Sequence, residues 1–484
     1  MPLLSQKSDS VKTAVTDEVV VHGQMRINDF STGSKIITID SAYYRSNTSS
    51  SLADLFALNN LLFIKSYGAL SSPSLRGTSA GHTAVLWNGF NLQNPMYGQL
   101  DLALVPQDFV NNVAVQFGGK SALFGSGAVG GVIHLNNKPI FGTGYTVKAS
   151  GLIGSFSGFR ETGSFNYSGK RYISSVKVFN YSLQNNYPFK NIAEQGQPVI
   201  NQTNAQQFQK GILVEQYFVP VKNQQLSFRY WYQQNKRHVP PLMMVVSNGA
   251  YQTDYFHRLT GEWQKTGNRT LWVIRTAYFN EALNFVVPKS FSDSVSRSHT
   301  IIGEAESKMH IASRYQLNLG LNNTFSTASS SSYQHIPSLN RLGLFGSFKS
   351  LFLKERLIVT LSIRQELFDR KLLPVTPSLG LEYYFYNPFF VKATASRIYK
   401  VPTFNDLYWV PGGNPNLLPE SGWTEDLTIG LKHTTKNENF YTIGLTVFNS
   451  NINNWIQWLP RSGLVWSPEN VMKVWSRGIE ANGK

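Results

Sequence analysis

The chain has 484 residues, more than the roughly 100–200 residues of most single soluble domains. It has no cysteine, which excludes disulfides and thiolate metal sites, and no stretch of roughly 18 continuous apolar residues, which excludes an ordinary transmembrane helix. Its formal net charge of +16 comes from lysines and arginines spread over many segments, whereas a nucleic-acid-binding protein concentrates such charge in one patch, so we expect no nucleic-acid partner.

The amino-terminal segment changes character at residue 17. Residues 1–16 are polar and lack periodicity, so we expect them to be disordered. Asp17, Glu18, Val19, Val20 and Val21 then form an acidic and β-branched run. Such a run is either the first strand of the next domain or an extended peptide that adds a strand to the sheet edge of a partner.

Residues 74–137 have the pattern of a compact α/β unit with tight loops, and shorter elements precede them. Lys35–Ile39 alternates as a strand, and Ser51–Ala57 indicates a short helix capped by serine. Short apolar runs separated by Gly-rich turns follow, which is typical of short strands. These runs are Thr83–Trp87, Asn112–Phe117 and Val132–Leu135.

Two Gly-rich motifs in this unit resemble nucleotide-binding motifs only superficially. Gly125–Gly130 satisfies G-x-G-x-x-G, but a β-rich segment follows at once and Lys148–Phe156 contains no acidic residue for a ribose. Gly119–Ser121 ends like a P-loop, but the first glycine of that motif falls on Ala114. We therefore expect backbone bends or close packing at these glycines, and no nucleotide site.

Two segments of the unit look like exposed loops, Tyr67–Pro73 and Asn91–Gly98. An aromatic residue, an amide and a methionine on a loop carried by a rigid scaffold suit contact with a ligand. The alternative is a pair of ordinary surface turns, because Asn-Pro and Tyr-Gly are turn signals in any protein.

Beyond Pro139 the chain alternates apolar and polar residues in segments of about 10 residues, which is the weak signature of a transmembrane β-barrel. Examples are the rows Leu317–Asn322, Leu357–Arg364 and Tyr441–Phe448, with aromatics near the ends of other runs. A soluble β-sandwich rarely repeats so many long strands with polar residues on one face. The long polar loops between strands suit the outer side of a barrel; they are Gln184–Gln207, Arg237–Asp254 and Ser326–Pro337.

Several motifs in order resemble the plug domain of TonB-dependent outer-membrane receptors. They are Leu75-Arg76-Gly77, VLWNGFNLQNP from Val85 and SALFGSGAVGGVIHL from Ser121. Residues 397–431 add a second resemblance, in which Glu420 matches the Pro-Glu of the family's later barrel. The common Asp-Gly of the plug is Asn88-Gly89 here, and the familiar Gly-Pro is Gly118-Gly119, so the turn chemistry is kept in a divergent branch.

The resemblance implies an all-β, antiparallel transmembrane β-barrel with an N-terminal α/β plug domain in its lumen. Residues 1–30 would be a flexible leader with the TonB box at Asp17–Val21, residues 31–140 the plug, and residues 141–484 the barrel. The ligand-facing plug residues would be Tyr67, Gln93, Asn94, Met96 and Tyr97. Structural plug residues would be Arg76, Gly77, Gly125, Gly127, Gly130 and Gly131, with Arg76 needing fixed acceptors if buried.

The function implied is active import across the outer membrane with energy from the TonB complex. The pattern is most similar to the vitamin B12 transporter branch, with ferric siderophore receptors next, so the ligand would be cobalamin-like or a metal chelate. Other expected partners are outer-membrane lipid and lipopolysaccharide, whose phosphates suit the positive charge, and a surface lipoprotein. The alternative is a passive pore or adhesin barrel without energy coupling.

We expect neither enzymatic activity nor a cofactor. The chain shows no catalytic carboxylate pair and no nucleophile elbow. His238, His257 and His335 share no short spacing, so we expect no metal site.

The resemblance also predicts that the sequence is incomplete at both ends. The start MPLLSQKSDS lacks the pattern of a signal peptide, which export to an outer membrane requires. Barrels of this family have 22 strands of about 9–11 residues, and the residues after Pro139 supply no more than about two-thirds of that. We therefore expect sequence before Met1 and after Lys484, and a truncated barrel with an open sheet or a distorted closure.

Overall fold

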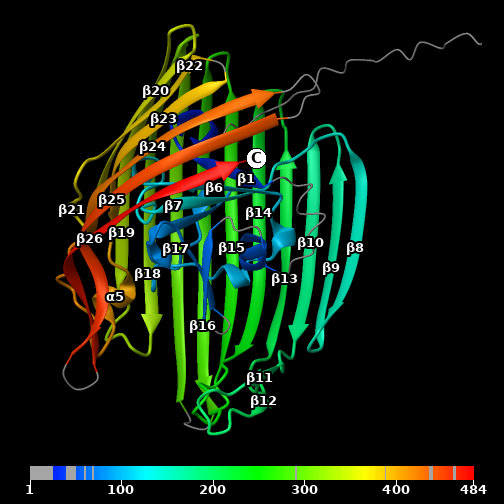
Figure 1. Ribbon diagram of the computed structural model, residues 1–484. Coiled ribbons are helices and arrows are strands. Elements are labelled where there is room, and N and C mark those ends of the chain that lie inside the picture. Colours follow the sequence, from blue (N-terminus) through cyan, green and yellow to red (C-terminus); the bar gives the residue numbers. More distant parts are fainter. Residues whose placement is uncertain are drawn as a thin grey trace, which may run out of the picture.

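The computed structural model describes residues 26–39, 51–58, 62–67, 70–288, 292–386, 388–434, 440–461 and 465–483. A small mixed sheet near the N-terminus lies inside a large antiparallel sheet built by the rest of the chain (Figure 1). The helices in this part of the chain lack the length and apolar character to cross a bilayer. The predicted TonB box, Asp17–Val21, lies outside the described residues.

The inner unit is a five-stranded sheet with short helices and turns around it. Its order is β1-β6-β7-β4-β5, with β4 and β7 parallel and the other neighbours antiparallel, and β2 and β3 form a separate hairpin. The strands are β1 (Ile36–Ile39), β2 (Phe63–Tyr67), β3 (Leu70–Ser74), β4 (Thr83–Trp87), β5 (Phe90–Asn91), β6 (Asn112–Phe117) and β7 (Gly131–Asn136). The helical elements are α1 (Arg26–Phe30), α3 (Leu52–Leu58), η1 (Ala80–His82), η2 (Leu102–Leu104), η3 (Gln107–Phe109) and α4 (Ser121–Phe124).

The large sheet is a barrel whose strand order runs β10-β13 through β26 and then β8-β9. Its first strands are β8 (Gly144–Gly154), β9 (Gly158–Ser168), β10 (Tyr172–Leu183), β13 (Gln207–Phe218), β14 (Gln224–His238), β15 (Tyr251–Thr266), β16 (Thr270–Val287), β17 (Ser292–Ala312) and β18 (Tyr315–Ser330). The remainder are β19 (Ser338–Phe352), β20 (Leu357–Phe368), β21 (Lys371–Leu372), β22 (Thr376–Tyr386), β23 (Phe389–Lys400), β24 (Glu420–Thr434), β25 (Phe440–Pro460) and β26 (Trp466–Gly483). The connecting loops carry the hairpin of β11 (Pro188–Lys190) with β12 (Val199–Asn201), and helix α5 (Phe404–Tyr408).

The closure of the barrel lies between β26 and β8. We expected an open sheet or a distorted closure. The strand order is a ring, but among the described residues no pairing register joins β26 to β8, and every residue of β8 after Gly144 is exposed. In Figure 1, β24, β25 and β26 cross obliquely in front of the inner unit, while β14–β17 stand upright behind it.

The predicted alternation of the barrel strands is confirmed. Leu319 and Leu321 of β18 are 50% and 43% exposed, whereas Asn318, next to Leu319, is fully buried. In β20, Leu361 and Ile363 point outward in the same way, with Ser362 buried. An apolar outer face and a polar inner face exclude a soluble sandwich, in which these leucine rows would form the core.

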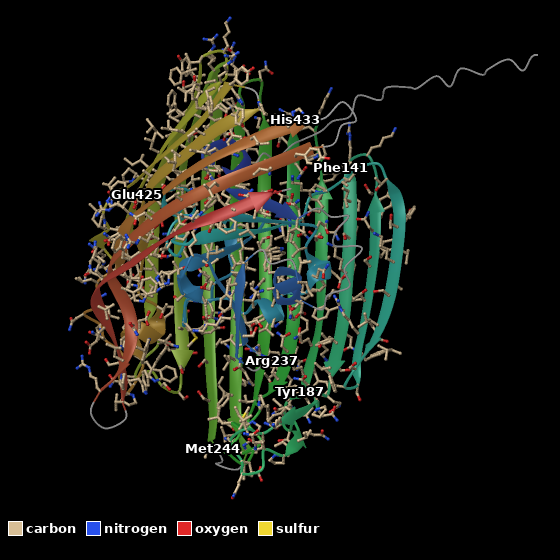
Figure 2. All side chains as sticks on the ribbon, viewed as in Figure 1. Phe141, Tyr187, Arg237, Met244, Glu425 and His433 are labelled. Atoms are coloured by element: carbon tan, nitrogen blue, oxygen red, sulfur yellow. The ribbon has the colours of Figure 1, made fainter. Side chains whose placement is uncertain are left out.

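The two ends of the barrel differ in the length of their connections. Turns of a few residues join the strands at one end, and the long loops with β11, β12 and α5 lie at the other, which also carries Tyr187 and Met244 (Figure 2). Phe141 and His433 lie toward the end with the short turns (Figure 2). The long-loop end suits the outside of a cell, as outer-membrane barrels have short periplasmic turns.

The structure differs from the prediction of a flexible leader over residues 1–30. Arg26–Phe30 forms helix α1, in which Ile27 and Phe30 are buried. Asp29 pairs with Lys308 of β17 at 3.0 Å. The ion pair and the two apolar side chains explain why these five residues are ordered, and Lys308 places them near the short-turn end.

The inner unit packs against the barrel wall through a shared aromatic core. Trp87 meets Trp231 of β14 edge to face, with centroids 5.3 Å apart, and Phe109 meets Phe179 of β10 in the same way at 5.2 Å. Such pairs add to the area that they bury. The sheet β1-β6-β7-β4-β5 is therefore held inside the barrel, as the prediction of a plug requires.

Candidate functional site

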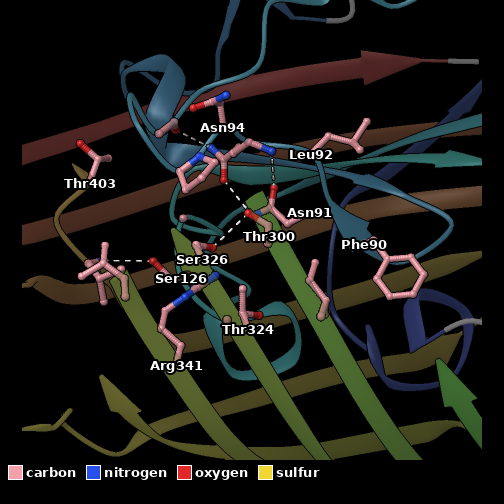
Figure 3. A pocket seen from close by; sticks show the side chains of 18 of the residues that line it. Phe90, Asn91, Leu92, Asn94, Ser126, Thr300, Thr324, Ser326, Arg341 and Thr403 are labelled. Carbon is pink, nitrogen blue, oxygen red and sulfur yellow. Dashed lines mark hydrogen bonds between the residues drawn. The ribbon is translucent and has the colours of Figure 1, made fainter. Parts of the chain in front are cut away.

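A cavity of about 140 Å³ separates the inner unit from the barrel wall near the long-loop end (Figure 3). This volume suits on the order of ten water molecules. The inner unit contributes residues 89–95, Gly98 and residues 124–127, and the wall contributes β16–β20 and the segment Lys400–Thr403. The cavity thus lies between a loop and inward-facing strand positions, a common place for a ligand site.

The wall of the cavity carries hydroxyl groups beside charged side chains, among them Glu281, Glu304, Arg364 and Lys400. Thr300 of β17 and Ser326 of β18 face each other at 3.0 Å, with Ser298 and Thr324 on neighbouring inward positions (Figure 3). Arg341 of β19 contributes a positive charge and lies 3.8 Å from Glu366. The wall therefore offers donors and acceptors for a polar ligand, with one partly exposed cation.

Gln93 lies at the cavity, but its side chain is used inside the loop. Its Nε2 is within 3.1–3.3 Å of the carbonyl oxygens of Gly98, Thr83 and Gly81, and its Oε1 accepts from Asn91 at 3.0 Å. These bonds fix the shape of the Asn91–Gly98 loop. The ligand contact expected of Gln93 stays a prediction. In the structure its side chain stabilises the conformation of the loop.

Asn94 also lines the cavity and ties the loop to the wall. Its Nδ2 donates to Glu281 of β16 at 2.9 Å, and its Oδ1 accepts from the backbone N–H of Met96 at 2.8 Å. Glu281 in turn binds the buried guanidinium of Arg258 through Nε at 2.8 Å. A plug loop is thus anchored to a charged pair on two barrel strands.

Helix α5 holds the far side of the same loop through its backbone. The N–H groups of Phe404 and Asn405 donate to the carbonyl oxygens of Pro95 and Met96 at 3.1 and 2.9 Å. Thr403 and Asp406 form a capping box at the start of α5, which leaves these two N–H groups for the loop.

The remaining predicted ligand residues lie away from the cavity. Met96 is 3% exposed and packs in a core cluster with Phe404, so the expectation that it faces a ligand is wrong in this structure. Tyr97 is 38% exposed but does not line the cavity. Tyr67 is the last residue of β2, and the predicted loop Tyr67–Pro73 is wrong from Leu70, where β3 begins.

The glycines predicted to be structural lie where the chain bends or packs closely. Gly125 and Gly127 line the cavity with φ of +80° and +87°, a region that favours glycine. A Cβ on Gly130 would overlap the Thr78 hydroxyl, and one on Gly131 would lie 2.5 Å from Leu75. These contacts fit the predicted structural role, which stays a prediction.

Arg76 joins the inner unit to the barrel near its closure. Its guanidinium pairs with Asp426 of β24 and, through Nε, with Glu480 of β26 at 2.9 Å. Its backbone has φ of +53°, and Gly77 follows with φ of +76°. A buried arginine with two carboxylate acceptors suits a structural role more than ligand contact.

A second buried cluster was not found from the sequence. His82 hydrogen-bonds Glu420 through Nε2 and Ser79 through Nδ1, and its ring stacks on Trp455 at 3.9 Å. Lys400 binds the same carboxylate at 3.0 Å. Burial lowers the pKa of the His82 imidazole, although Glu420 opposes the shift, so the ring is neutral and donates to Glu420.

Sequence reasoning singled out Glu420 but neither its histidine partner nor the hydroxyl wall. Glu420 lies 338 positions from His82, so no local pattern joins them. The hydroxyls at alternating positions of β17 and β18 were the available signal for the wall, because inward positions repeat every two residues. In the described part of the chain, no group of three or more His, Asp or Glu residues is placed to hold a metal ion.

Comparison with known proteins follows the division into an inner unit and a barrel. The family model described as "TonB-dependent Receptor Plug Domain" matches residues 28–132, and "TonB dependent receptor-like, beta-barrel" matches residues 154–484. The chain is 25% identical over 454 residues to the vitamin B12 transporter BtuB of Vibrio vulnificus and 23% identical over 434 residues to that of Photobacterium profundum. These alignments cover 85% and 86% of this chain and 66% of each relative, so the chain spans slightly less than two-thirds of their length.

Solved structures share the fold at low sequence identity. The FrpB iron transporter of Neisseria meningitidis matches with a TM-score of 0.78 and 12% identity, covering 93% of this chain and 77% of that one. The ferric enterobactin receptor PfeA of Pseudomonas aeruginosa matches with a TM-score of 0.75 and 17% identity, covering 92% and 77%.

Proposed function

Since the chain belongs to the TonB-dependent receptor family, we propose that it is an active importer that captures a scarce nutrient outside the cell. Members of this family are outer-membrane receptors and transporters, and we assign the chain no catalytic role. The nutrient binds between the plug and the long-loop end of the barrel and passes inward when the plug is moved from the periplasmic side.

The observation that carries the proposal is the plug held in the lumen by buried polar contacts to carboxylates of the barrel. Arg76 with Asp426, Asn94 with Glu281 and His82 with Glu420 each join a plug side chain to a barrel carboxylate. Polar contacts of this kind can be exchanged for water more easily than an apolar core. A filled lumen with such contacts favours a gated importer over a passive pore.

The proposal also assigns a domain to each segment of the chain. Residues 1–30 carry the leader with Asp17–Val21 as the TonB box, residues 31–140 form the plug and residues 141–484 the barrel. The fold supports this arrangement because β7 ends at Asn136 and β8 begins at Gly144. The position of Asp29 beside Lys308 also supports the assignment of the leader. This contact lies near the short-turn end of the barrel, where an energy-coupling partner in the periplasm would act.

For the ligand we propose a cobalamin-like molecule. The hydroxyl groups of Thr300 and Ser326 and the carbonyl groups of the plug loop suit a ligand rich in amides. Each cation of the lining has a carboxylate near it, since Arg341 and Arg364 share Glu366 and Lys400 pairs with Glu420. The cavity therefore holds little free positive charge for a ferric catecholate. A ferric siderophore is the second candidate, favoured by Arg341 because its side chain is partly exposed.

We also propose a surface lipoprotein as a partner at the long-loop end. The loop between β14 and β15 exposes a run of apolar side chains, with Leu242, Met244 and Val246 each about 80% exposed. A patch of this kind outside a membrane marks an interaction surface.

Titration with cyanocobalamin and with a ferric catecholate tests the ligand. We expect the purified protein to bind cyanocobalamin, and Thr300→Val with Ser326→Ala to weaken binding about 30-fold, since two lost hydrogen bonds of about 1 kcal/mol each are worth about 2 kcal/mol. Thr276→Val, at an outward position of β16, is the matched control and leaves binding unchanged. Binding of the catecholate alone would overturn the assignment.

Deletion of Asp17–Val21 tests energy coupling. We expect the deletion to abolish uptake of labelled ligand by cells and to leave binding intact. Uptake that continues after the deletion would favour the passive pore.

A further inference from the structure

The charged side chains that line the cavity belong to separate ion-paired groups, and some of these groups carry a net charge. The charged lining residues are Glu281, Glu304, Arg341, Arg364 and Lys400. Glu281 pairs with Arg258 and Lys400 pairs with Glu420, so each of these groups is neutral. The charges of the groups on β19–β20 and on β16–β17 do not cancel.

Arg341 of β19 and Arg364 of β20 share one carboxylate, that of Glu366. Nε of Arg364 donates to Oε2 of Glu366 at 2.9 Å, whereas Nη1 of Arg341 lies 3.8 Å from Oε1, too far for a hydrogen bond. The hydroxyl of Tyr399 also donates to Oε2, at 2.5 Å. Asp369, the next acid along the chain, is exposed and accepts from a backbone N–H of β19. Two guanidinium groups with one carboxylate leave this group with one unmatched positive charge.

Arg341 is the cation of this group that a ligand can reach. Its side chain is 25% exposed, compared with 4% for Arg364, and it extends from β19 into the cavity (Figure 3). Among the described residues, nothing lies within hydrogen-bond distance of its guanidinium. Arg364 is enclosed between the wall and the plug, where a Cβ on Gly343 or Gly125 would lie 2.6 or 3.3 Å from its Nη2.

Two hydroxyl groups line the cavity together with Arg341 (Figure 3). Thr324 of β18 is its register partner, and in the part of the chain that the structure describes the Thr324 hydroxyl has no hydrogen-bond partner. Ser126 of the plug accepts from the backbone N–H of Val401 at 3.1 Å, so its own hydroxyl hydrogen can donate to a ligand. A guanidinium with neighbouring hydroxyl donors is a suitable set of groups for binding an oxyanion.

The group on β16 and β17 carries the opposite charge. The guanidinium of Arg275 lies 2.5 Å from Glu304 and 3.0 Å from Glu306, so one cation faces two carboxylates. Glu304 lines the cavity, and β17 lies two strands from the β19 of Arg341, a separation of about 10 Å. The wall of the cavity is therefore positive near β19 and negative near β17.

We propose that Arg341, Thr324 and Ser126 form an anion subsite of the cavity, which binds a singly charged oxyanion of the nutrient, either a phosphodiester or a carboxylate. One unmatched positive charge matches one such group and not a ferric catecholate, which carries several negative charges. Glu304 accepts from N–H groups at the other end of the ligand, so the wall fixes its orientation. The inference rests on the proposed function and specifies the chemistry of its ligand; in a cobalamin the oxyanion is the phosphodiester of the nucleotide loop.

The first test compares two corrinoids on the full-length protein in detergent. Cyanocobalamin carries the phosphodiester, and dicyanocobinamide lacks the nucleotide loop that contains it. We expect Arg341→Gln to weaken cyanocobalamin binding about 10- to 100-fold, because a hydrogen-bonded charge pair is lost, and to bind dicyanocobinamide as wild type does. Arg341→Lys, which keeps the charge, should lose less. Arg297→Gln removes the same charge from an exposed position of β17 outside the cavity and should leave both affinities unchanged.

A small-anion probe tests the subsite without any corrinoid. Phenylglyoxal modifies accessible arginines, and mass spectrometry measures its rate of reaction at Arg341. Relative to chloride at the same ionic strength, dimethyl phosphate should slow this reaction by a factor that rises with its concentration to at least about threefold, and should not protect Arg297. Protection by dimethyl phosphate alone identifies a phosphodiester as the occupant, and protection by acetate as well extends the class to carboxylates. Protection by neither anion would overturn the proposal.

The two tests separate the subsite from the proposed ligand. Cyanocobalamin binding that Arg341→Gln leaves unchanged, or an equal loss of dicyanocobinamide binding, would refute the subsite and keep the cobalamin-like ligand. Protection of Arg341 by dimethyl phosphate in a protein that binds neither corrinoid would refute that ligand and keep the subsite.

Discussion

Replacement of Asn94 by aspartate tests the anchor between the plug loop and the barrel. The substitution keeps the shape of the side chain but turns the 2.9 Å bond from Nδ2 to Glu281 into a contact between two carboxyl groups. Because Arg258 binds Glu281 through Nε at 2.8 Å, the introduced carboxyl is the one that must take up a proton. A protonated acid can donate to Glu281 and restore the bond.

The magnitude of this effect depends on pH. Protonating a carboxyl with an ordinary pKa of about 4 costs about 4 kcal/mol at pH 7 and about 1 kcal/mol at pH 5. The contact raises the pKa of the introduced carboxyl, so the native loop binds more protons than the opened loop. Its stability is therefore greatest at low pH and falls as the pH rises. Asn94→Leu, which loses a bond to a charged acceptor, should cost about 2 kcal/mol at both pH values.

Hydrogen exchange at the amide of Gly98 measures this anchor. This amide donates to the backbone carbonyl oxygen of Asn94 at 2.8 Å, a bond that both variants keep, so its protection reports opening of the loop. We expect Asn94→Asp to open the loop more than Asn94→Leu at pH 7 and less at pH 5. An effect of Asn94→Asp that does not change between these pH values would refute the reasoning.

Two further predictions concern the plug–barrel contacts and are checked by thermal unfolding in detergent. Gly118→Ala should destabilise the protein by about 3 kcal/mol because the added Cβ would overlap Asp426. Gly142 has a similar positive φ but open space around it, so Gly142→Ala should cost about 1 kcal/mol. Equal costs for the two variants would contradict this reasoning. Glu420→Gln should cost about 4 kcal/mol because it removes the counter-charge of the buried Lys400 and leaves one acceptor oxygen for two donors. Glu425→Gln, on the outer face of the same strand, should change stability by less than about 1 kcal/mol. A Glu420→Gln variant as stable as Glu425→Gln would show that the cluster is dispensable.

The barrel could be predicted from sequence because its signal is local. Leu319 and Asn318 are neighbours, and the period of two fixes which one faces lipid. The plug followed from short runs and glycine-rich turns in order. The alternation in the barrel and the apolar runs in the plug both depend on whether each residue faces water, lipid or the protein core.

The roles of individual loop residues could not be predicted because they depend on distant partners. Asn94 was expected to face a ligand and does line the cavity, but its amide is engaged by Glu281, far along the chain. Met96 was expected there too, and packs instead in a cluster with Phe404. The composition of a loop indicates that it can bind a ligand. Contacts with the barrel determine which of its side chains are left free to do so.

The hydrogen bonds that Phe404 and Asn405 of helix α5 make to the plug loop join main-chain atoms only. An alanine scan of Pro95, Met96, Phe404 and Asn405 would leave both N–H to carbonyl bonds in place and so would understate this joint. Removing an amide hydrogen, as Asn405→Pro does, is the change that exposes it. Homologues can therefore change the side chains at these positions and still keep the hydrogen bonds between α5 and the plug.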